Sequence, residues 1–162
     1  MRYWCAIPWL VVDVIHLDRT DIFGFNPTAR AAIEVLDDMD ARKRPLSVSL
    51  RDWGNNHRFA GSGDRSAIGN LAYDALRLAS SSAFLADEDT SAAKVYGGVL
   101  RLQGMTPSEL KGALEGDKFA PELPSDDVLE TLHKADLTLA DPHVRADIPQ
   151  WLVPSFEANF AD

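Results

Sequence analysis

The segment from Arg58 to Arg77, RFAGSGDRSAIGNLAYDALR, most constrains the fold, because it joins a glycine-containing turn to a long amphipathic helix. The two glycines permit a tight entry, and Ser62 or Asp64 can accept a hydrogen bond from the first free N–H groups. Apolar residues then recur at helical spacing: Ile68, Leu71, Ala72, Ala75 and Leu78 or Ala79. One face of this helix is therefore predicted to be buried in a helical bundle, with Arg65 and Arg77 at its borders.

Start and stop signals predict helices on both sides of this segment. Asn26 and Pro27 mark a helix start, because proline fits the first helical turn. A second helix is predicted over residues 46–53, with Gly54 as the first residue of its stop signal. The serines at 80–82, followed by the acidic residues at 87–89, predict that the third helix frays into an exposed loop.

The second half of the chain carries its own capping signals. Thr90 can cap a fourth helix, in which each glycine of the pair Gly97-Gly98 costs roughly 1 kcal/mol relative to alanine. That cost predicts the close approach of a neighbouring helix. Thr106 and Glu109 have the spacing of a capping box that opens the next helix.

These signals predict an all-α bundle of six or seven helices with an apolar N-terminal arm. Residues 1–25 form the arm, residues 26–147 the bundle and residues 148–162 a connector. A last bundle helix is predicted after Ser125, and prolines cut the C-terminal segment into short pieces.

The first fifteen residues, MRYWCAIPWLVVDVI, are apolar but interrupted by Pro8 and Asp13, and no small-residue cleavage site follows them. They are too short to span a bilayer, so no membrane association is expected. Two interpretations remain: an arm that covers a groove on this subunit or a neighbour, or an upstream extension of the reading frame. A single cysteine, Cys5, excludes an internal disulfide and fits a cytoplasmic location.

The net charge of −9 is unevenly distributed. Residues 1–41 carry 3 basic and 7 acidic side chains, residues 42–86 carry 7 and 3, and residues 87–162 carry 6 and 15. Because salt screens each charge beyond about 8–10 Å, the basic middle third can bind phosphate although the whole chain is acidic. The remote acidic residues predict weak RNA binding by this domain alone.

Three segments, in order, resemble a known family. Asp64-Arg65, followed by Ile68 and by the run from Leu71 to Arg77, is similar to the "DR…LVYGVLR" helix of that family. The segment TARAAIEVLD at residues 28–37 resembles its opening helix, and IPQWLVPSFEANF at residues 148–160 resembles its "P-x-W-L" connector. The family is the NusB-like N-terminal domain of the RsmB-type (Sun/Nop) S-adenosylmethionine-dependent RNA cytosine-5 methyltransferases.

The resemblance implies a NusB-like bundle that binds ribosomal RNA as an accessory domain, while a separate domain holds S-adenosylmethionine and the cysteine nucleophile. That catalytic domain is absent from this chain, so no cofactor and no catalytic residue are expected here. The segment GSGDRS lacks the third glycine and the preceding strand of a dinucleotide fingerprint. The alternative is a NusB-like protein-interaction or antitermination-type module, with a protein partner or a second copy bound through the N-terminal arm.

The predicted RNA surface consists of the basic residues of the middle third, because the arginine fork donates two hydrogen bonds together to phosphate. They are Arg42, Lys43, Arg44, Arg51, Arg58, Arg65 and Arg77.

Two simpler interpretations stay open: the cluster is a solvated charged face, and Arg65 pairs within the bundle. His57 could join a phosphate-facing cluster, whereas Trp53 and Tyr73 are interpreted as core residues rather than stacking platforms. The four histidines lack the spacing of a metal site.

Overall fold

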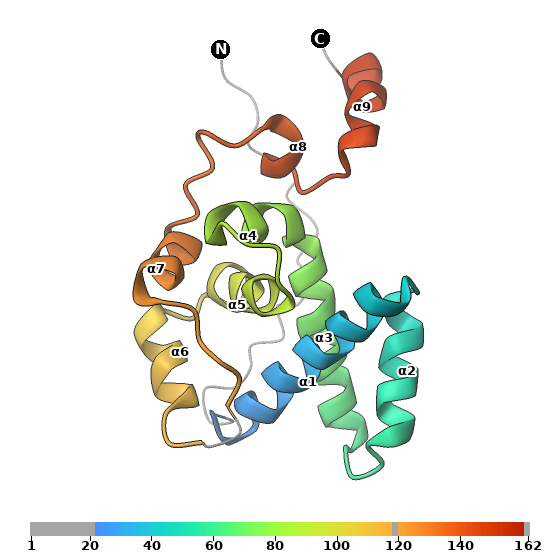
Figure 1. Cartoon of the computed structure of the whole chain (residues 1–162), viewed down its shortest axis with the longest axis vertical. Helices are drawn as coiled ribbons and strands as arrows, with labels where there is room; N and C mark the ends of the chain where they lie inside the picture. The colour runs from blue at the N-terminus through green and yellow to red at the C-terminus, as the bar shows by residue number, and fades with distance from the viewer. Residues whose placement is uncertain (1–21, 118–119, 161–162) are drawn as a thin grey trace.

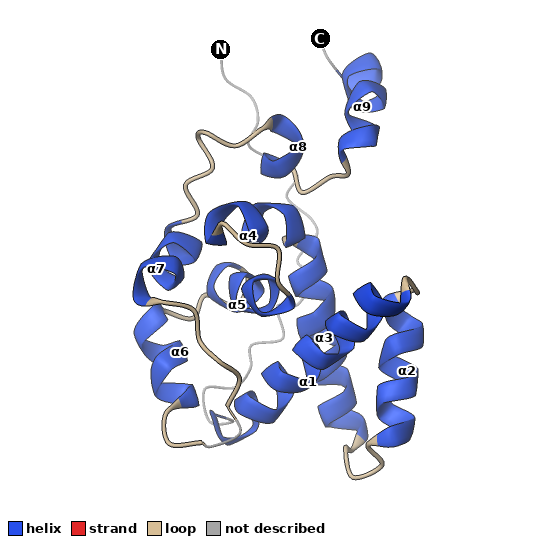
Figure 2. Cartoon of the chain, in the orientation of Figure 1, coloured by secondary structure: helices blue, strands red, loops and turns tan. Residues whose placement is uncertain are grey.

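The computed structural model describes residues 22–117 and 120–160, and every regular element within these ranges is a helix (Figures 1 and 2). Nine α-helices and one 3-10 helix occur in the described residues: α1 (Ile22–Arg42), α2 (Leu46–Asn56), α3 (Ser62–Arg77), α4 (Ala79–Ala86), α5 (Ser91–Arg101), α6 (Pro107–Leu114), α7 (Asp126–Lys134), α8 (Pro142–Arg145), η1 (Gln150–Leu152) and α9 (Val153–Phe160). The predicted all-α bundle is confirmed. None of these helices has both the length and the apolar character needed to cross a membrane.

Helix α5 forms the centre of the bundle, and α1, α3, α4 and α7 all pack against it (Figure 1). Its side chains are buried from Ala93 to Leu100. Tyr96 is completely enclosed and donates a hydrogen bond to the carbonyl of Glu122 at 3.2 Å. This burial raises the pKa of Tyr96 to about 12, because a phenolate would lose its hydration there.

The glycine pair on α5 lies where two helices approach most closely, as predicted. A Cβ atom at Gly98 would lie 3.3 Å from the backbone nitrogen of Ala75 on α3. A Cβ atom at Gly97 would overlap the Oγ of Ser82 on α4. The absence of both side chains is therefore what lets α3 and α4 pack against α5.

The prediction that residues 80–82 form an exposed loop is wrong, because these serines belong to α4 and Ser81 and Ser82 are fully buried. The Asp147 carboxylate accepts hydrogen bonds from the Ser81 backbone N–H at 2.8 Å and from its hydroxyl at 2.6 Å. Arg101 donates to the same hydroxyl at 2.6 Å. Partners distant in sequence thus satisfy the N–H and hydroxyl of Ser81, whereas the buried Ser82 hydroxyl has no hydrogen-bond partner in the described part of the chain.

The N-terminal boundary also differs from the prediction. Residues 22–25, assigned to the arm, are helical, and Pro27 lies inside α1 rather than in its first turn. Proline removes only one backbone donor, and the Thr28 hydroxyl adds a bond to the carbonyl of Gly24 at 2.8 Å. The rest of the arm, residues 1–21, lies outside the described residues, as does any contact that it makes.

Other local predictions are confirmed. Thr106 Oγ1 accepts from the Glu109 N–H at 3.2 Å, and Glu109 accepts from the Thr106 N–H at 2.9 Å, which completes the capping box. Thr90 caps α5 through the N–H of Ala93 at 3.1 Å. The described bundle contains α1 to α8, one helix more than the six or seven predicted, since the short helices α4 and α8 have no long apolar repeat to predict them.

Candidate nucleic-acid interface

The seven basic residues predicted to bind RNA lie at three separate places along α1, α2 and α3 and the turns between them. Arg42, Lys43 and Arg44 lie where α1 turns into α2, and Arg51 follows on α2. The other three flank α3: Arg58 and Arg65 near its start, and Arg77 in its last turn. Helix α2 is 11 residues long, or about 16 Å, and α3 is 16 residues long, or about 24 Å, so the two helices keep the three places apart.

The turn after α1 directs Arg44 back toward the helices. Lys43 has a left-handed φ of 50°, and the Arg44 N–H donates to the carbonyl of Met39 at 3.3 Å. This pattern is a common helix ending, in which one residue in the left-handed region reverses the chain. It places the Arg44 side chain between α1 and α2 rather than in solvent.

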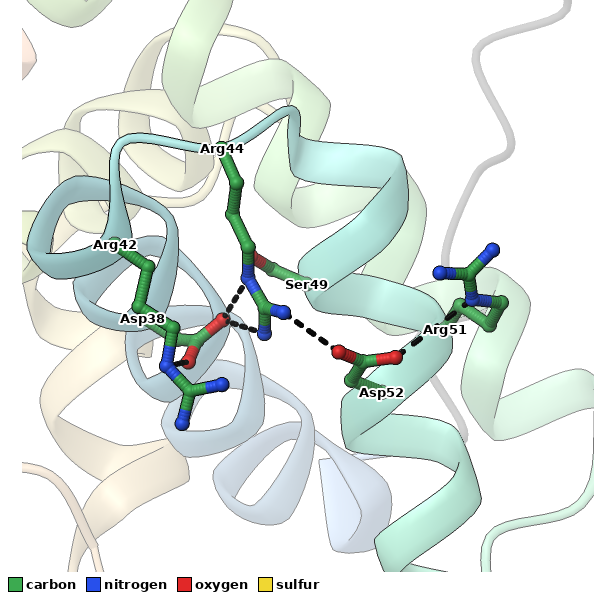
Figure 3. A network of polar contacts seen from close by, with 6 residues as sticks. All are labelled: Asp38, Arg42, Arg44, Ser49, Arg51 and Asp52. Carbon is green, nitrogen blue, oxygen red and sulfur yellow. Dashed lines mark hydrogen bonds and ion pairs between the residues drawn. The ribbon is translucent and has the colours of Figure 1, made fainter.

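Arg44 is the centre of a polar group that we call the arginine network: Asp38, Arg42, Arg44, Ser49, Arg51 and Asp52 (Figure 3). Its Nε donates to Asp38 at 2.9 Å and to the Ser49 hydroxyl at 3.1 Å, and its Nη1 donates to Asp52 at 2.6 Å. Its Nη2 also contacts Asp38. Only 17% of the side chain is exposed, so Arg44 joins α1 to α2 and has little surface left for phosphate.

The network lowers the pKa of the Asp38 carboxyl, first through a hydrogen bond from Ser49 and then through one from Arg44. The Asp38 carboxylate in turn raises the pKa of Arg44. Both groups are therefore charged at neutral pH and compensate each other. With three arginines and two aspartates, the whole network has a net charge of +1.

Three further arginines form exposed ion pairs. Arg42 Nε lies 3.0 Å from Asp38, Arg51 Nε lies 3.6 Å from Asp52, and the Arg77 Nη1 lies 3.0 Å from Asp74. Exposed pairs of this kind contribute about 0–1 kcal/mol, so a phosphate can compete for these arginines. The adjacent carboxylates nevertheless weaken the attraction of the surface for a polyanion.

Arg65 closes the turn between α2 and α3. Its Nε donates to the carbonyl of Ala60 at 3.0 Å, and its Nη2 donates to the carbonyl of Gly54 at 2.9 Å. Gly54, predicted to end the second helix, lies inside α2, where a Cβ atom would be 3.4 Å from the guanidinium. Arg65 thus bonds within the bundle, and its partners are backbone carbonyls.

Arg58 and Lys43 are exposed and have no hydrogen bond or ion pair within residues 22–117 and 120–160. Arg58 lies in the turn that Arg65 closes. Among the seven predicted cations, these two side chains therefore have no bonded partner in the described structure, whereas Arg65 is bound by backbone carbonyls.

Arg58 belongs to a second group, which we call the aromatic tip: Trp53, His57, Arg58 and Phe59. The Trp53 and His57 rings stack with centroids 4.2 Å apart, and the Phe59 ring meets His57 edge to face at 5.7 Å. Phe59 is 85% exposed. Sequence reasoning missed Phe59, although its position between Arg58 and the glycine turn already indicated an exposed loop.

Trp53 and Tyr73 were both predicted to be core residues, but they differ in burial. Trp53 packs partly against the core and donates from its ring N–H to Glu34 at 3.1 Å. Tyr73 is 49% exposed, so its interpretation as a core residue is wrong. It follows the buried Leu71 and Ala72 on α3 but points off the buried stripe.

A hollow of about 370 Å³ lies between α1 and α2 and is bordered by both groups. Asp38, Arg42 and Arg44 line one part, and the stacked rings of Trp53 and His57 line another. Asn55 and Asn56 add exposed amide groups to its rim. The lining is therefore polar and of mixed charge, with aromatic surface at the end where α2 finishes.

Fold and site together define an all-α bundle with a mixed-charge, aromatic edge. Comparison of the chain with protein-family models, with curated proteins and with solved structures finds no match. In the described part of the chain, no three His, Cys, Asp or Glu side chains gather closely enough to hold a metal ion.

Proposed function

We propose that this chain is an RNA-binding accessory domain of a ribosomal RNA cytosine-5 methyltransferase-like protein. The observation that carries the proposal is the exposed Arg58, which has no carboxylate partner in the described structure and projects from a turn beside an exposed aromatic ring. A free guanidinium on a fixed turn is suited to phosphate, because no ion pair has to break before it binds.

The resemblance noted in the sequence supports the same proposal. Its first two segments fall on α1 and α3, which pack against each other within the bundle, and its third falls on η1 and α9. In this proposal the domain adopts a NusB-like role in the cytoplasm and helps to dock ribosomal RNA. A separate domain then supplies S-adenosylmethionine, the cysteine nucleophile and the methyl transfer.

The charge distribution sets the expected strength of binding. The arginine network is largely compensated, and the chain as a whole has a net charge of −9. Binding by this domain alone is therefore expected to be weak. It should decline steeply with added salt, because phosphate contacts release counterions from the RNA.

The test measures binding of the purified chain to labelled fragments of ribosomal RNA by fluorescence anisotropy at several salt concentrations. Arg58→Glu should weaken binding by about tenfold, which corresponds to roughly 1.4 kcal/mol. Arg145→Glu is the matched control, because it makes the same change of charge at an exposed arginine of α8 that lies outside the predicted RNA surface. The proposal fails if no fragment shows salt-sensitive binding, or if both variants bind like the wild type.

A second candidate function is a protein-interaction module, which apolar exposure in the C-terminal segment favours. Leu139 is 92% exposed and Trp151 is 75% exposed, an arrangement suited to a protein partner. This function can be tested by light scattering, which measures the oligomeric state of the full chain, of a variant lacking residues 1–21 and of Trp151→Ser. If all three proteins are monomers, self-association through the arm or through Trp151 is contradicted.

A further inference from the structure

We infer that Arg58 and Phe59 form a binding site for one unpaired nucleotide of RNA, with the base stacked on the Phe59 ring and a phosphate held by Arg58. The inference rests on the proposed function and specifies what this turn recognises. The new element is the aromatic ring of Phe59, which the sequence analysis did not identify.

The Phe59 ring is exposed but not isolated. Its contact with His57 continues through the parallel stack of His57 on Trp53, whose rings are inclined by only 16°. His57 Nδ1 lies 2.8 Å from the Trp53 carbonyl, so this nitrogen donates and the ring orientation is fixed. Trp53 is held in turn by Glu34 on α1. A chain of contacts therefore ties the exposed ring to the helical body.

The backbone on the other side of the ring is fixed as well. The Ala60 N–H donates to the carbonyl of His57 at 3.0 Å, which closes a tight turn around Arg58 and Phe59. The Ala60 carbonyl then accepts from Arg65. Because both flanks are held before any ligand binds, little conformational entropy is lost when a base stacks on the ring.

The chemistry of the tip matches a nucleotide better than an apolar side chain. Every base presents a π-face, and stacking of a base on an aromatic side chain contributes about 1–3 kcal/mol. Arg58 is the neighbouring residue in the chain and supplies the complementary charge for the phosphate. The base faces of a duplex are covered by their neighbours, so only an unpaired base can use this ring.

The carboxylates around the tip are already bonded: Glu34 accepts from the Trp53 ring N–H and pairs with Arg30. The nearest carboxylate in sequence, Asp64, accepts the Gly61 N–H at 2.9 Å, which places it in the first turn of α3. There the positive end of the helix dipole compensates part of its charge. The amides of Asn55 and Asn56 lie at the end of α2 and can donate to or accept from a base edge.

The experiment compares a fluorescein-labelled single-stranded RNA of about twelve nucleotides with its perfect duplex, using the full chain and fluorescence anisotropy. Phe59→Ala and Phe59→Leu should each weaken single-strand binding by about 5- to 150-fold, the equivalent of losing one stacked base. Phe59→Trp should bind within about threefold of the wild type, since it keeps a π-face. Duplex binding should be unchanged in all three.

Salt dependence separates the two parts of the site. The ratio of wild-type to Phe59→Ala affinity should stay constant between low and moderate salt, because stacking releases no counterions. Arg58→Gln should instead reduce the slope of log affinity against log salt by about 0.7, the value for one phosphate contact on a single strand. Unchanged far-UV circular dichroism would show that each variant remains folded.

The outcomes distinguish this inference from the proposed function. If Arg58→Gln weakens RNA binding but Phe59→Ala does not, RNA binding stands and the stacking site is overturned. If Phe59→Leu binds as well as the wild type, an apolar contact replaces stacking and the inference also fails. If Phe59→Ala alters only the oligomeric state, the ring serves a protein contact, which again overturns the inference. If the wild type binds no RNA, the proposed function itself fails.

Discussion

The interface between α5 and its neighbouring helices, which we call the seam, differs from the α1–α2 edge in the solvent exposure of its polar contacts. Within the seam, the Ser81 hydroxyl contacts both Asp147 and Arg101 and is shielded from water. At the edge, Arg42 and Arg51 pair with carboxylates while most of each side chain stays in solvent. Polar contacts in the seam thus help to determine the packing of helices, whereas the exposed pairs of Arg42 and Arg51 contribute little to it.

The comparison also shows why a count of basic residues is a poor measure of a binding surface. Arg44 and Arg58 lie fourteen positions apart in the same basic third of the sequence. Arg44 is enclosed by two aspartates, and Arg58 has no such partner in the described structure. Their availability for phosphate therefore differs although their sequence context looks alike.

The largest effect is expected for Gly97→Ala in the seam. The new methyl group would overlap the Ser82 side chain, so α4 has to move away from α5. We expect the free energy of unfolding to fall by about 1–3 kcal/mol, as for other overpacked cores. Urea denaturation followed by circular dichroism measures the change.

Gly112→Ala on α6 is the matched control for this substitution. Nothing lies within 4 Å of the position that its Cβ would occupy, so no atom has to move. Alanine should then stabilise the helix by about 0.5–1 kcal/mol through its higher helix propensity. Equal effects of the two substitutions would contradict the close approach of α4 and α5.

The next effect concerns Asp147, which joins the segment before η1 to α4. Asp147→Ala leaves the Ser81 N–H without its acceptor and Arg101 without the nearby charge, and should destabilise the protein by about 1–3 kcal/mol. Burial already lowers the pKa of Arg101, and the Asp147 charge counteracts that effect.

Asp147→Asn separates the effect of losing the carboxylate charge from the backbone strain that alanine would introduce at this position. Asparagine tolerates the left-handed φ of 50° at this position and keeps one oxygen acceptor. It should therefore lose less stability than alanine in the same urea titration. If both variants unfold at the wild-type midpoint, Asp147 does not hold α4 in place.

A smaller effect is expected at the edge, where stability should depend on pH through Asp38. Its folded-state pKa lies below the ordinary value of 3.8, so its contribution is fully present above that value and is lost as pH falls through the folded pKa. Thermal unfolding monitored from about pH 5 to pH 2 should show a shallower decline for Asp38→Asn than for the wild type.

Ser49→Ala should weaken the same pH dependence, because the Ser49 hydroxyl provides the largest single cause of the lowered Asp38 pKa. A decline as steep as that of the wild type in both variants would assign the acid sensitivity to other carboxyl groups.

The smallest effect on stability is expected for Arg77→Gln. Its pair with Asp74 spans one helical turn and is exposed, so the free energy of unfolding should change by less than about 0.5 kcal/mol. Calorimetry would detect a larger change. A loss comparable to that of Asp147→Ala would show that an exposed ion pair supports the fold as strongly as the buried contacts of the seam.

Much of the fold could be predicted because it depends on local signals. The apolar repeat on α3, the capping box at Thr106 and the paired glycines on α5 each act within a few residues of sequence. The burial of Ser81 could not be predicted, because its partner Asp147 is 66 positions away. A serine run predicts a loop unless such a distant partner is known.

The candidate site was harder to predict than the fold. Sequence identified the basic residues but not which carboxylates would meet them, since Asp38 and Asp52 approach Arg44 only after α1 and α2 pack side by side. Phe59 was overlooked because a single aromatic residue in a turn has no period that distinguishes an exposed ring from a buried one.

The two carbonyl contacts of Arg65 have a consequence for mutational scanning of this surface. A charge-reversal variant at this position would release Gly54 and Ala60 together, so the loop that displays its neighbours would lose its shape. Any resulting defect in ligand capture would be indistinguishable, in a simple alanine or glutamate series, from removal of a direct contact. For a variant at position 65, it must therefore be shown that the turn between α2 and α3 keeps its structure before a loss of affinity is assigned to a direct contact of Arg65.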